Sequence, residues 1–423
     1  MDFKFIHAAD IHLDSPLLGL ERYEGAPVEQ VRGATRKAFQ NLVELALEEG
    51  VDFVLISGDL YDGDWRDYNT GLFFTTQGAR LRESGIKVFI VRGNHDAASQ
   101  ITRILRLPDN IKDLSTREPE TVRLDDLGVA LHGQGFSTPA VTEDLSRSYP
   151  DPLKGYFNIG LLHTCATGRE GHASYAPCNI NYLINKGYDY WALGHVHKRE
   201  VLQEDPWIIF PGNIQGRHIR EEGARGCTLV RVQEGRVQSL EHRDLDVLRW
   251  SLCPIDVTGA ETYDQVLEGA EKTIEEELGR GEGRLLALRL VIRGFSNAHH
   301  KIIDRQQKLA NDLRALAVER GLDRIWLEKI KVETQAPVKR EELMESTPVA
   351  SLLEYIQESS RSEQFLEELI GELEREKNAL PAELFQEGEI ELGDKEYLRS
   401  LLPQVEELII SRLMKGGEFT SED

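Results

Sequence analysis

Short runs of apolar, mostly β-branched residues recur through the first 240 residues, and each run ends in a polar cluster. Runs of this length that are bounded by turn residues predict buried strands. Seven strands are expected at 3–9, 52–57, 87–91, 129–132, 158–163, 190–194 and 207–210. A hairpin of two further strands, at 227–232 and 236–241, is expected to close this region.

Helical periodicity separates the first three of these runs. Between 28 and 49, Val31, Ala34, Ala38 and Leu42 recur every three to four residues, which is the spacing of one helix face. A second helix is expected at 67–84. Strands that alternate with helices and are apolar on both faces predict an α/β layered structure with a buried sheet.

The pattern changes after residue 245. Strands near 251–257, 285–292 and 325–332 alternate with helices at 262–278 and 301–320, which predicts a small β-α-β-α-β domain. From 341 onward two amphipathic helices are expected, with apolar stripes at Phe365–Leu373 and Leu398–Leu413. The predicted domains are therefore 1–245, 246–336 and an acidic helical tail at 337–423.

Composition limits the classes of protein that remain. The formal net charge is −23, and residues 341–423 carry 22 acids against 7 bases, so the tail accounts for −15 of it. An acidic chain is not an obvious nucleic-acid binder, because phosphates attract Lys and Arg. Four scattered cysteines make no disulfide framework, and neither a signal peptide nor a membrane span is expected, which favours a cytoplasmic protein without a membrane partner.

Polar side chains gather where the predicted strands end. Functional groups of open α/β sheets collect beyond the carboxyl ends of strands. Any single one of these residues is as well explained by a buried histidine with a satisfied hydrogen bond or by an Asp that forms a turn. Their coincidence at five strand ends instead indicates one site made of Asp10, His12, Asp59, Asn94, His95, His163, His195 and His197.

These residue types point to metal chemistry. Imidazole, carboxylate and amide oxygen suit Mn, Fe or Zn, and no thiolate is among them. Seven ligands exceed the needs of one tetrahedral ion but suit two ions that share a carboxylate. Two such ions about 4 Å apart can clamp a phosphoryl group and activate a water.

The order DxH, GDxxD, GNHD, an isolated His and GHxH resembles the calcineurin-like metallophosphoesterases over about residues 1–245. The stretch DIHLDSP from Asp10 and the β-α-β-α-β domain are similar to the DNA-repair nuclease branch, which is SbcD-like, and above all to YhaO-type bacterial exonucleases. The resemblance implies a layered β-sandwich domain flanked by helices, followed by a small α+β cap domain and a helical C-terminal tail.

The resemblance also implies roles for the site residues. One ion would be held by Asp10, His12, Asp59 and His197, and the second by Asp59, Asn94, His163 and His195. His95 would stabilise the transition state or protonate the leaving 3′ oxygen, and Asp62 would orient His95. The alternative for Asp62 is a solvated loop acid.

The implied function is a metal-dependent DNA nuclease in DNA repair or recombination, an exonuclease with endonuclease action also open, that uses a water activated by two divalent ions. Mn²⁺ is the expected metal, with Fe and Zn as alternatives. The alternative substrates are nucleotides or other small phosphodiesters. A catalytically decayed subunit is disfavoured, because no ligand is missing. Arg217 and His218 are candidates for substrate phosphate contacts, and a solvated basic loop is the alternative.

Partners follow from the same resemblance. DNA contacts would come from dispersed bases, namely Arg92, Arg103, Arg106, Lys198 and Arg199. The tail helices either pack on their own chain or dock on a coiled-coil, SbcC-like ATPase as helix-in-groove contacts. A homodimer is expected from the family alone.

Overall fold

A computed structural model describes residues 1–15, 27–62, 68–98, 106–166, 176–337, 362–377 and 394–402, together with Tyr355, Glu358 and Val405. The chain divides into two compact units. One comprises Met1–Cys253, Ile274–Leu290 and Ala317–Lys329, and the other comprises Pro254–Thr273, Val291–Leu316 and Ile330–Asp423. The predicted boundaries at 245 and 336 stay predictions, because this division passes through the three-stranded sheet described below.

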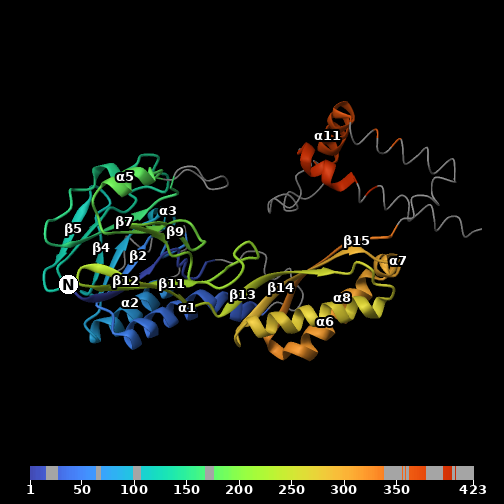
Figure 1. The fold of residues 1–423 in the computed structure, drawn as a ribbon, viewed down its shortest axis with the longest axis horizontal. Helices are drawn as coiled ribbons and strands as arrows, with labels where there is room; N and C mark the ends of the chain where they lie inside the picture. Colours follow the sequence, from blue (N-terminus) through green and yellow to red (C-terminus); the bar gives the residue numbers. More distant parts are fainter. Residues whose placement is uncertain are drawn as a thin grey trace, which may run out of the picture. The chain divides into compact units, whose positions relative to one another are not determined.

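Two six-stranded mixed sheets lie in the first unit (Figure 1). The first has the order β12-β11-β1-β2-β3-β4 and comprises β1 (Phe3–Ala8), β2 (Phe53–Ser57), β3 (Lys87–Val91), β4 (Ile111–Asp113), β11 (Gly226–Gln233) and β12 (Arg236–Asp244). The second has the order β5-β6-β7-β8-β10-β9 and comprises β5 (Glu120–Leu124), β6 (Val129–Gly133), β7 (Phe157–His163), β8 (Tyr190–Gly194), β9 (Glu200–Glu204) and β10 (Trp207–Phe210). Strands β1 to β4 run parallel, as do β6, β7, β8 and β10. The α/β fold class and the layered sandwich are thereby confirmed.

Aromatic side chains fill the space between the two sheets. Phe5 and Phe53 stack with their ring centroids 5.1 Å apart, and the Phe5 ring meets Tyr190 of the second sheet edge-on at 5.2 Å. Further apolar residues of both sheets, such as Phe89 and Ile159, belong to the same buried cluster. The sheets therefore pack face to face through a continuous apolar layer.

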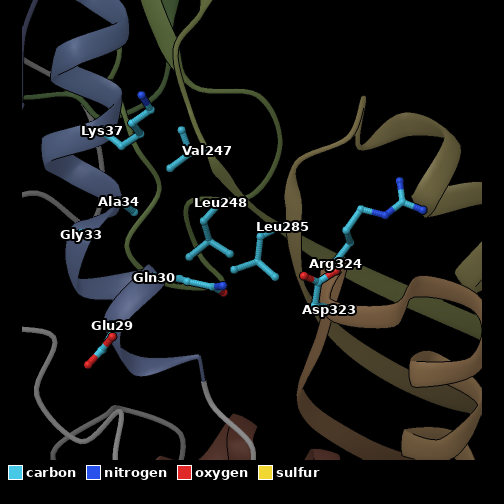
Figure 2. Close-up of a pocket in the computed structure, with 10 residues that line it drawn as sticks. All are labelled: Glu29, Gln30, Gly33, Ala34, Lys37, Val247, Leu248, Leu285, Asp323 and Arg324. Carbon is cyan, nitrogen blue, oxygen red and sulfur yellow. The ribbon is translucent and has the colours of Figure 1, made fainter.

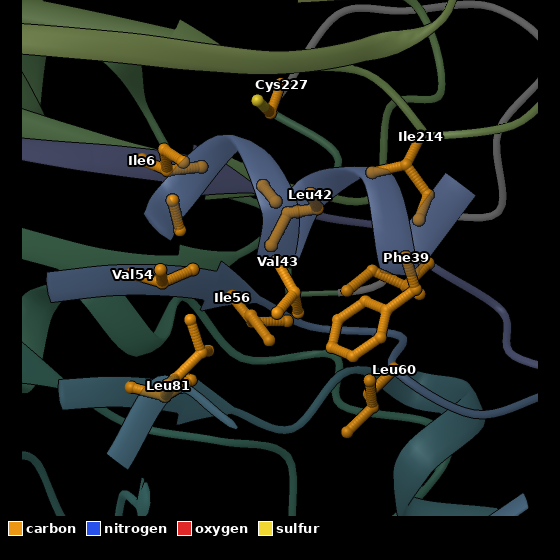
Figure 3. Close-up of a cluster of buried hydrophobic side chains, with 14 of the residues drawn as sticks. Ile6, Phe39, Leu42, Val43, Val54, Ile56, Leu60, Leu81, Ile214 and Cys227 are labelled. Carbon is orange, nitrogen blue, oxygen red and sulfur yellow. The ribbon is translucent and has the colours of Figure 1, made fainter. Parts of the chain in front are cut away.

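Helices cover the outer faces of both sheets. Helix α1 (Val28–Glu49) and helix α2 (Tyr68–Glu83) lie on the first sheet, where Phe39 and Leu42 pack with Ile6, Val54 and Ile56 (Figure 3). On the second sheet, Leu183 of the short helix α5 (Ile180–Asn185) packs among buried residues of β7, β8 and β10. Because each central strand is covered on both sides, its sequence is apolar throughout.

A three-stranded sheet, β13-β14-β15, follows these two sheets. Its strands are β13 (Leu248–Asp256), β14 (Leu285–Phe295) and β15 (Ile325–Gln335), with α6 (Tyr263–Arg280) and α8 (Gln306–Gly321) between them. The single helix predicted at 301–320 is wrong in detail. It is two helices, α7 (His299–Asp304) and α8, separated at Arg305, whose backbone leaves the helical region (φ −127°, ψ 35°).

Three observed strands were absent from the sequence prediction. Strands β5 and β9 are the edges of the second sheet, and β4 is an edge of the first. Edge strands pair on one side only and carry polar residues, so they lack a continuous apolar run. In β5, for example, Thr121 and Arg123 are exposed, Glu120 and Val122 are half-buried, and only Leu124 is buried.

Part of the acidic tail is described. Helix α11 (Glu363–Lys377) and a helical segment at 395–402 lie side by side, since Lys395 contacts both Glu363 (3.1 Å) and Glu367 (2.8 Å). Leu366 and Leu398 are almost completely buried. The C-terminal part of the second predicted stripe, which includes Leu408, Ile409 and Leu413, lies outside the described residues.

A groove of about 430 Å³ runs beside the first turns of α1 (Figure 2). Its apolar part comes from Ala34, Val247, Leu248 and Leu285, and its rim carries charged side chains, which are Glu29, Lys37, Asp323 and Arg324. None of the site residues predicted from the sequence lines it. Among the described residues, no helix has the length and hydropathy that a bilayer crossing requires.

The aromatic layer predicts the stability of the first unit. Replacing Phe53, which is fully buried between the sheets, with alanine should cost about 3–5 kcal/mol, because transfer free energy is lost and a cavity remains. Urea unfolding should measure this loss. In the control variant Leu72→Ala, a side chain on α2 that is 47% exposed should change the free energy of unfolding by less than about 0.5 kcal/mol. Equal effects of both changes would contradict the proposed location of the core.

Candidate metal centre

The carboxyl ends of five strands deliver the predicted site residues to one edge of the sandwich. In the first sheet, β1 leads to Asp10 and His12, β2 to Asp59, and β3 to Asn94 and His95. In the second sheet, β7 ends on His163, and β8 is followed by His195 and His197. The site therefore lies where the two sheets meet, and each sheet supplies part of it.

Close approach of the two sheets requires glycine at this edge. A Cβ atom on Gly194 would lie 1.8 Å from the backbone oxygen of Ser57, which belongs to the opposite sheet. A Cβ atom on Gly93 would lie 2.2 Å from Oδ1 of Asp59. Any side chain at either position would push apart the loops that carry the site residues, so no larger residue fits at these two glycines.

Four of the site residues have left-handed backbone conformations. The φ angles are 51° at Asp10, 47° at His12, 52° at Asp59 and 102° at His195. Such conformations cost about 1–3 kcal/mol each in residues other than glycine and gather at functional sites. They turn the side chains back over the strand ends, where a regular extension of the strand would carry them away.

The first group of converging side chains is Asp10, His12 and His197, whose ligand atoms lie within 4.8 Å of one another. The two Nε2 atoms of His12 and His197 are 3.3 Å apart. The backbone N–H of His195 donates to both carboxylate oxygens of Asp10, each at 3.1 Å. Burial raises the pKa of Asp10 to about 7 and lowers the pKa of His12 well below its usual value.

The second group is Asp59, His163 and His195. Nδ1 of His163 lies 2.9 Å from the backbone oxygen of Ser57, so it carries the proton and donates it there. Burial lowers the pKa of His163 to about 3, and its ring is therefore neutral. Its Nε2 consequently holds a lone pair, and this atom faces Oδ1 of Asn94 at 3.1 Å and Oδ2 of Asp59 at 3.5 Å.

His95 lies beside these groups and pairs with Asp62. The distance from Nδ1 of His95 to Oδ1 of Asp62 is 2.8 Å, and Ser15 donates to the other oxygen of Asp62 at 2.5 Å. The hydrogen bond to Asp62 raises the pKa of His95. Burial opposes ionisation of Asp62, but its contacts with His12 and His95 hold its pKa well below the usual range. Asp62 is thus a partner of His95 and not a solvated acid.

Glu221 was not singled out from the sequence, although it is central to the site. It is 4% exposed, and its Oε1 accepts the Nδ1 proton of His197 at 2.6 Å. Its Oε2 accepts from Asn213 at 2.9 Å and from the backbone N–H of Arg217 at 2.8 Å. Burial by itself lowers the pKa of His197, but Glu221 and Asp10 outweigh it and raise that pKa. The only sequence signal was an acid four residues after Arg217 in the loop that follows β10.

The two candidate phosphate contacts differ in their surroundings. The guanidinium of Arg217 lies between Asp62 (3.6 Å) and Glu221 (3.5 Å), and its side chain is 15% exposed. The side chain of His218 is 55% exposed, with Nε2 3.7 Å from Glu221. Only His218 is therefore openly available to a substrate.

The donor set fits divalent cations. In the second group, three acceptor atoms converge with no proton between them: Nε2 of His163, Oδ1 of Asn94 and Oδ2 of Asp59. In the first group, Nδ1 of His197 donates to Glu221, so Nε2 is the atom that faces His12, at 3.3 Å, and it is the atom that would bind a cation. Asp59 lies near both groups, since its Oδ2 is 3.9 Å from Nε2 of His12. Asn94 and Asp59 thus lie together with four histidines, which are His12, His163, His195 and His197. The role of these residues as metal ligands stays a prediction.

Comparisons with known proteins agree with this geometry. Residues 3–199 match the calcineurin-like phosphoesterase family model. The "uncharacterized metallophosphoesterase YhaO" of Bacillus subtilis (strain 168) is 36% identical over 297 residues, which is 69% of this chain and 72% of the relative. This chain belongs to the calcineurin-like metallophosphoesterase family. The predicted membership is confirmed, including its YhaO-type branch, because residues 250–335 match the middle domain of metallophosphoesterase YhaO.

More distant relatives carry other names. The DNA double-strand break repair protein Mre11 of Sulfurisphaera tokodaii is 27% identical over 267 residues, which is 58% of this chain and 63% of that protein. The crystal structure of TT1561 of Thermus thermophilus aligns with a TM-score of 0.34 at 15% identity, covering 58% of this chain and 100% of that one. Family membership makes the protein a hydrolase of phosphoesters, and members of this family use a dinuclear metal centre.

Glu221 provides the sharpest test of the site. In Glu221→Gln, an amide nitrogen replaces one of the two carboxylate oxygens. Either the oxygen that accepts the proton of His197 is lost, or the oxygen that accepts from Asn213 and from the N–H of Arg217 is lost. Because partners of this kind orient ligating histidines, the affinity for Mn²⁺ should fall about 10–100-fold in calorimetry.

The neighbouring exposed acid supplies the control. Glu222→Gln should leave the affinity for Mn²⁺ unchanged, because the side chain of Glu222 faces solvent. If Glu221→Gln binds Mn²⁺ as tightly as the unchanged protein, His197 does not contribute to the metal centre.

Proposed function

We propose that this protein is a metal-dependent DNA nuclease, principally an exonuclease, that works in DNA repair or recombination. One observation carries the proposal: His95 is held by Asp62 at 2.8 Å beside two convergent groups of Asp and His side chains. A histidine with a carboxylate partner next to a metal centre suits phosphodiester hydrolysis, in which a leaving oxygen must receive a proton.

The residues of the site would have two roles, which are metal binding and proton transfer. When bound, two divalent ions would polarise the phosphoryl group and lower the pKa of an attacking water. Asp10, His12, Asp59 and His197 would hold one ion, and Asp59, Asn94, His163 and His195 the other. Because Nδ1 of His95 donates to Asp62, its Nε2 is the atom that would give a proton to the leaving 3′ oxygen.

Support for DNA as substrate comes from the relatives. Several of them are named as DNA double-strand break repair proteins, and two of these match 58% and 77% of this chain. The predicted basic contacts are in part available: Arg106 and Lys198 are exposed. Arg103 lies outside the described residues, and Arg199 is half-buried. His218 would contact substrate phosphates from the loop after β10, whereas Arg217, the other candidate, faces Asp62 and Glu221.

One observation favours the second candidate, hydrolysis of nucleotides or other small phosphodiesters. Arg92 is engaged by Asp113 at 2.6 Å, which neutralises one of the few bases near the site. On a chain with a net charge of −23, fewer uncommitted bases weaken attraction to a long polyanion. A small diester makes no such demand.

The remaining assignments extend the same proposal. Mn²⁺ is the proposed metal, with Fe or Zn as alternatives, because the donors are nitrogen and oxygen without thiolate. A coiled-coil, SbcC-like ATPase is the proposed partner of the C-terminal helices, a second copy of the chain is a further one, and the cytoplasm is the proposed location.

The variant His95→Ala separates chemistry from metal binding. It should lower the rate of Mn²⁺-dependent degradation of end-labelled linear DNA at least about 100-fold, because proton transfer to the leaving oxygen is lost. Its metal content, measured by mass spectrometry, should equal that of the unchanged protein. The matched control His300→Ala, on α7, should keep full activity.

The substrates in this assay distinguish the two candidates. Duplex DNA, single-stranded DNA and bis(p-nitrophenyl) phosphate should be tested side by side, and release of the label gives the polarity. Cleavage of the small diester alone would contradict the nuclease assignment and favour the second candidate. Loss of metal from His95→Ala would make His95 a ligand.

Truncation tests the partner. A chain that ends after Pro337 should keep metal-dependent hydrolysis and lose binding to an SbcC-like ATPase, measured with the purified ATPase in a pull-down. Part of the apolar surface of the tail is buried within the tail itself, because Leu366 and Leu398 are buried where α11 and 395–402 lie side by side. Retained binding would mean that the tail packs on its own chain instead.

A further inference from the structure

We infer that Arg217 is a positioning residue that holds the two carboxylates orienting His95 and His197. The inference rests on the proposed hydrolytic function and adds one residue that links the proton donor to a ligand of the metal centre. It differs from the role predicted from the sequence, in which the guanidinium contacts substrate phosphates.

The first observation is that two histidine–carboxylate pairs share one arginine. His95 pairs with Asp62 at 2.8 Å and His197 with Glu221 at 2.6 Å. Nη1 of Arg217 lies 3.6 Å from Asp62, and Nη2 lies 3.5 Å from Glu221. A planar guanidinium offers donors in fixed directions, so one side chain can restrain both carboxylates at once.

The second observation is that the backbone and a hydroxyl reinforce the same arrangement. The N–H of Arg217 donates to Oε2 of Glu221 at 2.8 Å. Nη1 of Arg217 donates to the Ser15 hydroxyl at 3.4 Å, and Ser15 in turn donates to Asp62 at 2.5 Å. Asp62 is therefore restrained by the arginine side chain and by Ser15, and Glu221 is restrained by the side chain and the backbone N–H of the same arginine.

The third observation concerns access. Nε of Arg217 is buried, and among the described residues it has no hydrogen-bond partner. The side chain as a whole is 15% exposed, compared with 55% for His218 on the same loop. A phosphate would reach His218 first, whereas the guanidinium faces the protein's own acids.

The loop that carries Arg217 is itself anchored. Gln215 donates to the backbone oxygen of Leu248 at 2.6 Å and accepts from the N–H of Val247 at 2.9 Å. The indole N–H of Trp250 donates to the oxygen of Gly216 at 3.0 Å. Strand β13 thus holds the backbone on the N-terminal side of Arg217, which makes a fixed guanidinium possible.

A spectroscopic experiment on the full, metal-free chain tests the inference without relying on hydrolysis. In protein labelled with ¹⁵N-histidine, the hydrogen-bonded Nδ1 protons of His95 and His197 should appear far downfield, assigned through Asp62→Asn and Glu221→Gln. Both signals should broaden or disappear in Arg217→Met. They should persist in the control Arg220→Met, an exposed base on the same loop.

Kinetics then separate positioning from substrate binding. With bis(p-nitrophenyl) phosphate, Arg217→Met should lower kcat about 10–100-fold and change KM less than about 2-fold. Combined with Asp62→Asn, it should lower kcat by a smaller factor than it does alone, because the part of its effect that passes through Asp62 is already lost and only the part through Glu221 remains. Arg217→Lys should recover only part of kcat, because an ammonium group cannot span both carboxylates.

Two results would overturn the inference. Unchanged downfield signals in Arg217→Met would show that the carboxylates hold their histidines without the arginine. A raised KM with unchanged kcat would make Arg217 a substrate contact. If the unchanged protein hydrolyses no diester, the proposed function fails, whereas the spectroscopic result still decides the role of Arg217.

Discussion

The candidate centre depends on how closely two sheets approach at their carboxyl edges. Gly194 lies against the backbone oxygen of Ser57, and His163 donates its Nδ1 proton to that same oxygen. The backbone of His195 reaches across to bind the Asp10 carboxylate. These contacts join opposite sheets. The positions of the converging Asp and His side chains are therefore determined by how the two sheets pack and not by any one loop.

Strain and stability are linked through this geometry. Four site residues hold left-handed φ angles, and Asp10 and Asp59 are buried carboxyl groups whose burial raises their pKa. Neither feature would persist unless the aromatic layer between the sheets and the helices outside them held the strand ends in place. The buried carboxylate of Asp96 contributes directly, because it accepts from the backbone N–H groups of Tyr61 and Gly93. Packing of the core therefore offsets the free-energy cost of the left-handed backbone and of the buried carboxyl groups at the site.

The sequence predicts the strand ends well and their surroundings poorly. Apolar runs that stop at a polar residue identify Asp10, Asp59 and His163, since buried parallel strands are apolar on both faces. The pairing of His95 with Asp62 follows from the family resemblance and is present at 2.8 Å. Glu221 was missed because its importance comes from a tertiary contact with His197, and no local periodicity marks such a contact. The environment of Arg217 was missed for a similar reason, because one of its two partners, Asp62, lies far away along the chain.

The hydrogen bonds from Gln215 and Trp250 have a consequence for chimeric proteins. The segment that matches the YhaO middle domain begins at residue 250, so exchange of this segment between relatives would replace Trp250 while keeping Gly216. The residue at position 250 of the incoming segment would then have to donate the hydrogen bond that the backbone oxygen of Gly216 receives from Trp250. A junction placed at this point removes the Trp250 hydrogen bond from the loop that carries Arg217 and leaves the bonds of Gln215 to residues 247 and 248, whereas a junction after β13 leaves Gly216 and Trp250 in the same parent chain. The natural cutting point for such an exchange therefore lies inside the matched segment, not at its start.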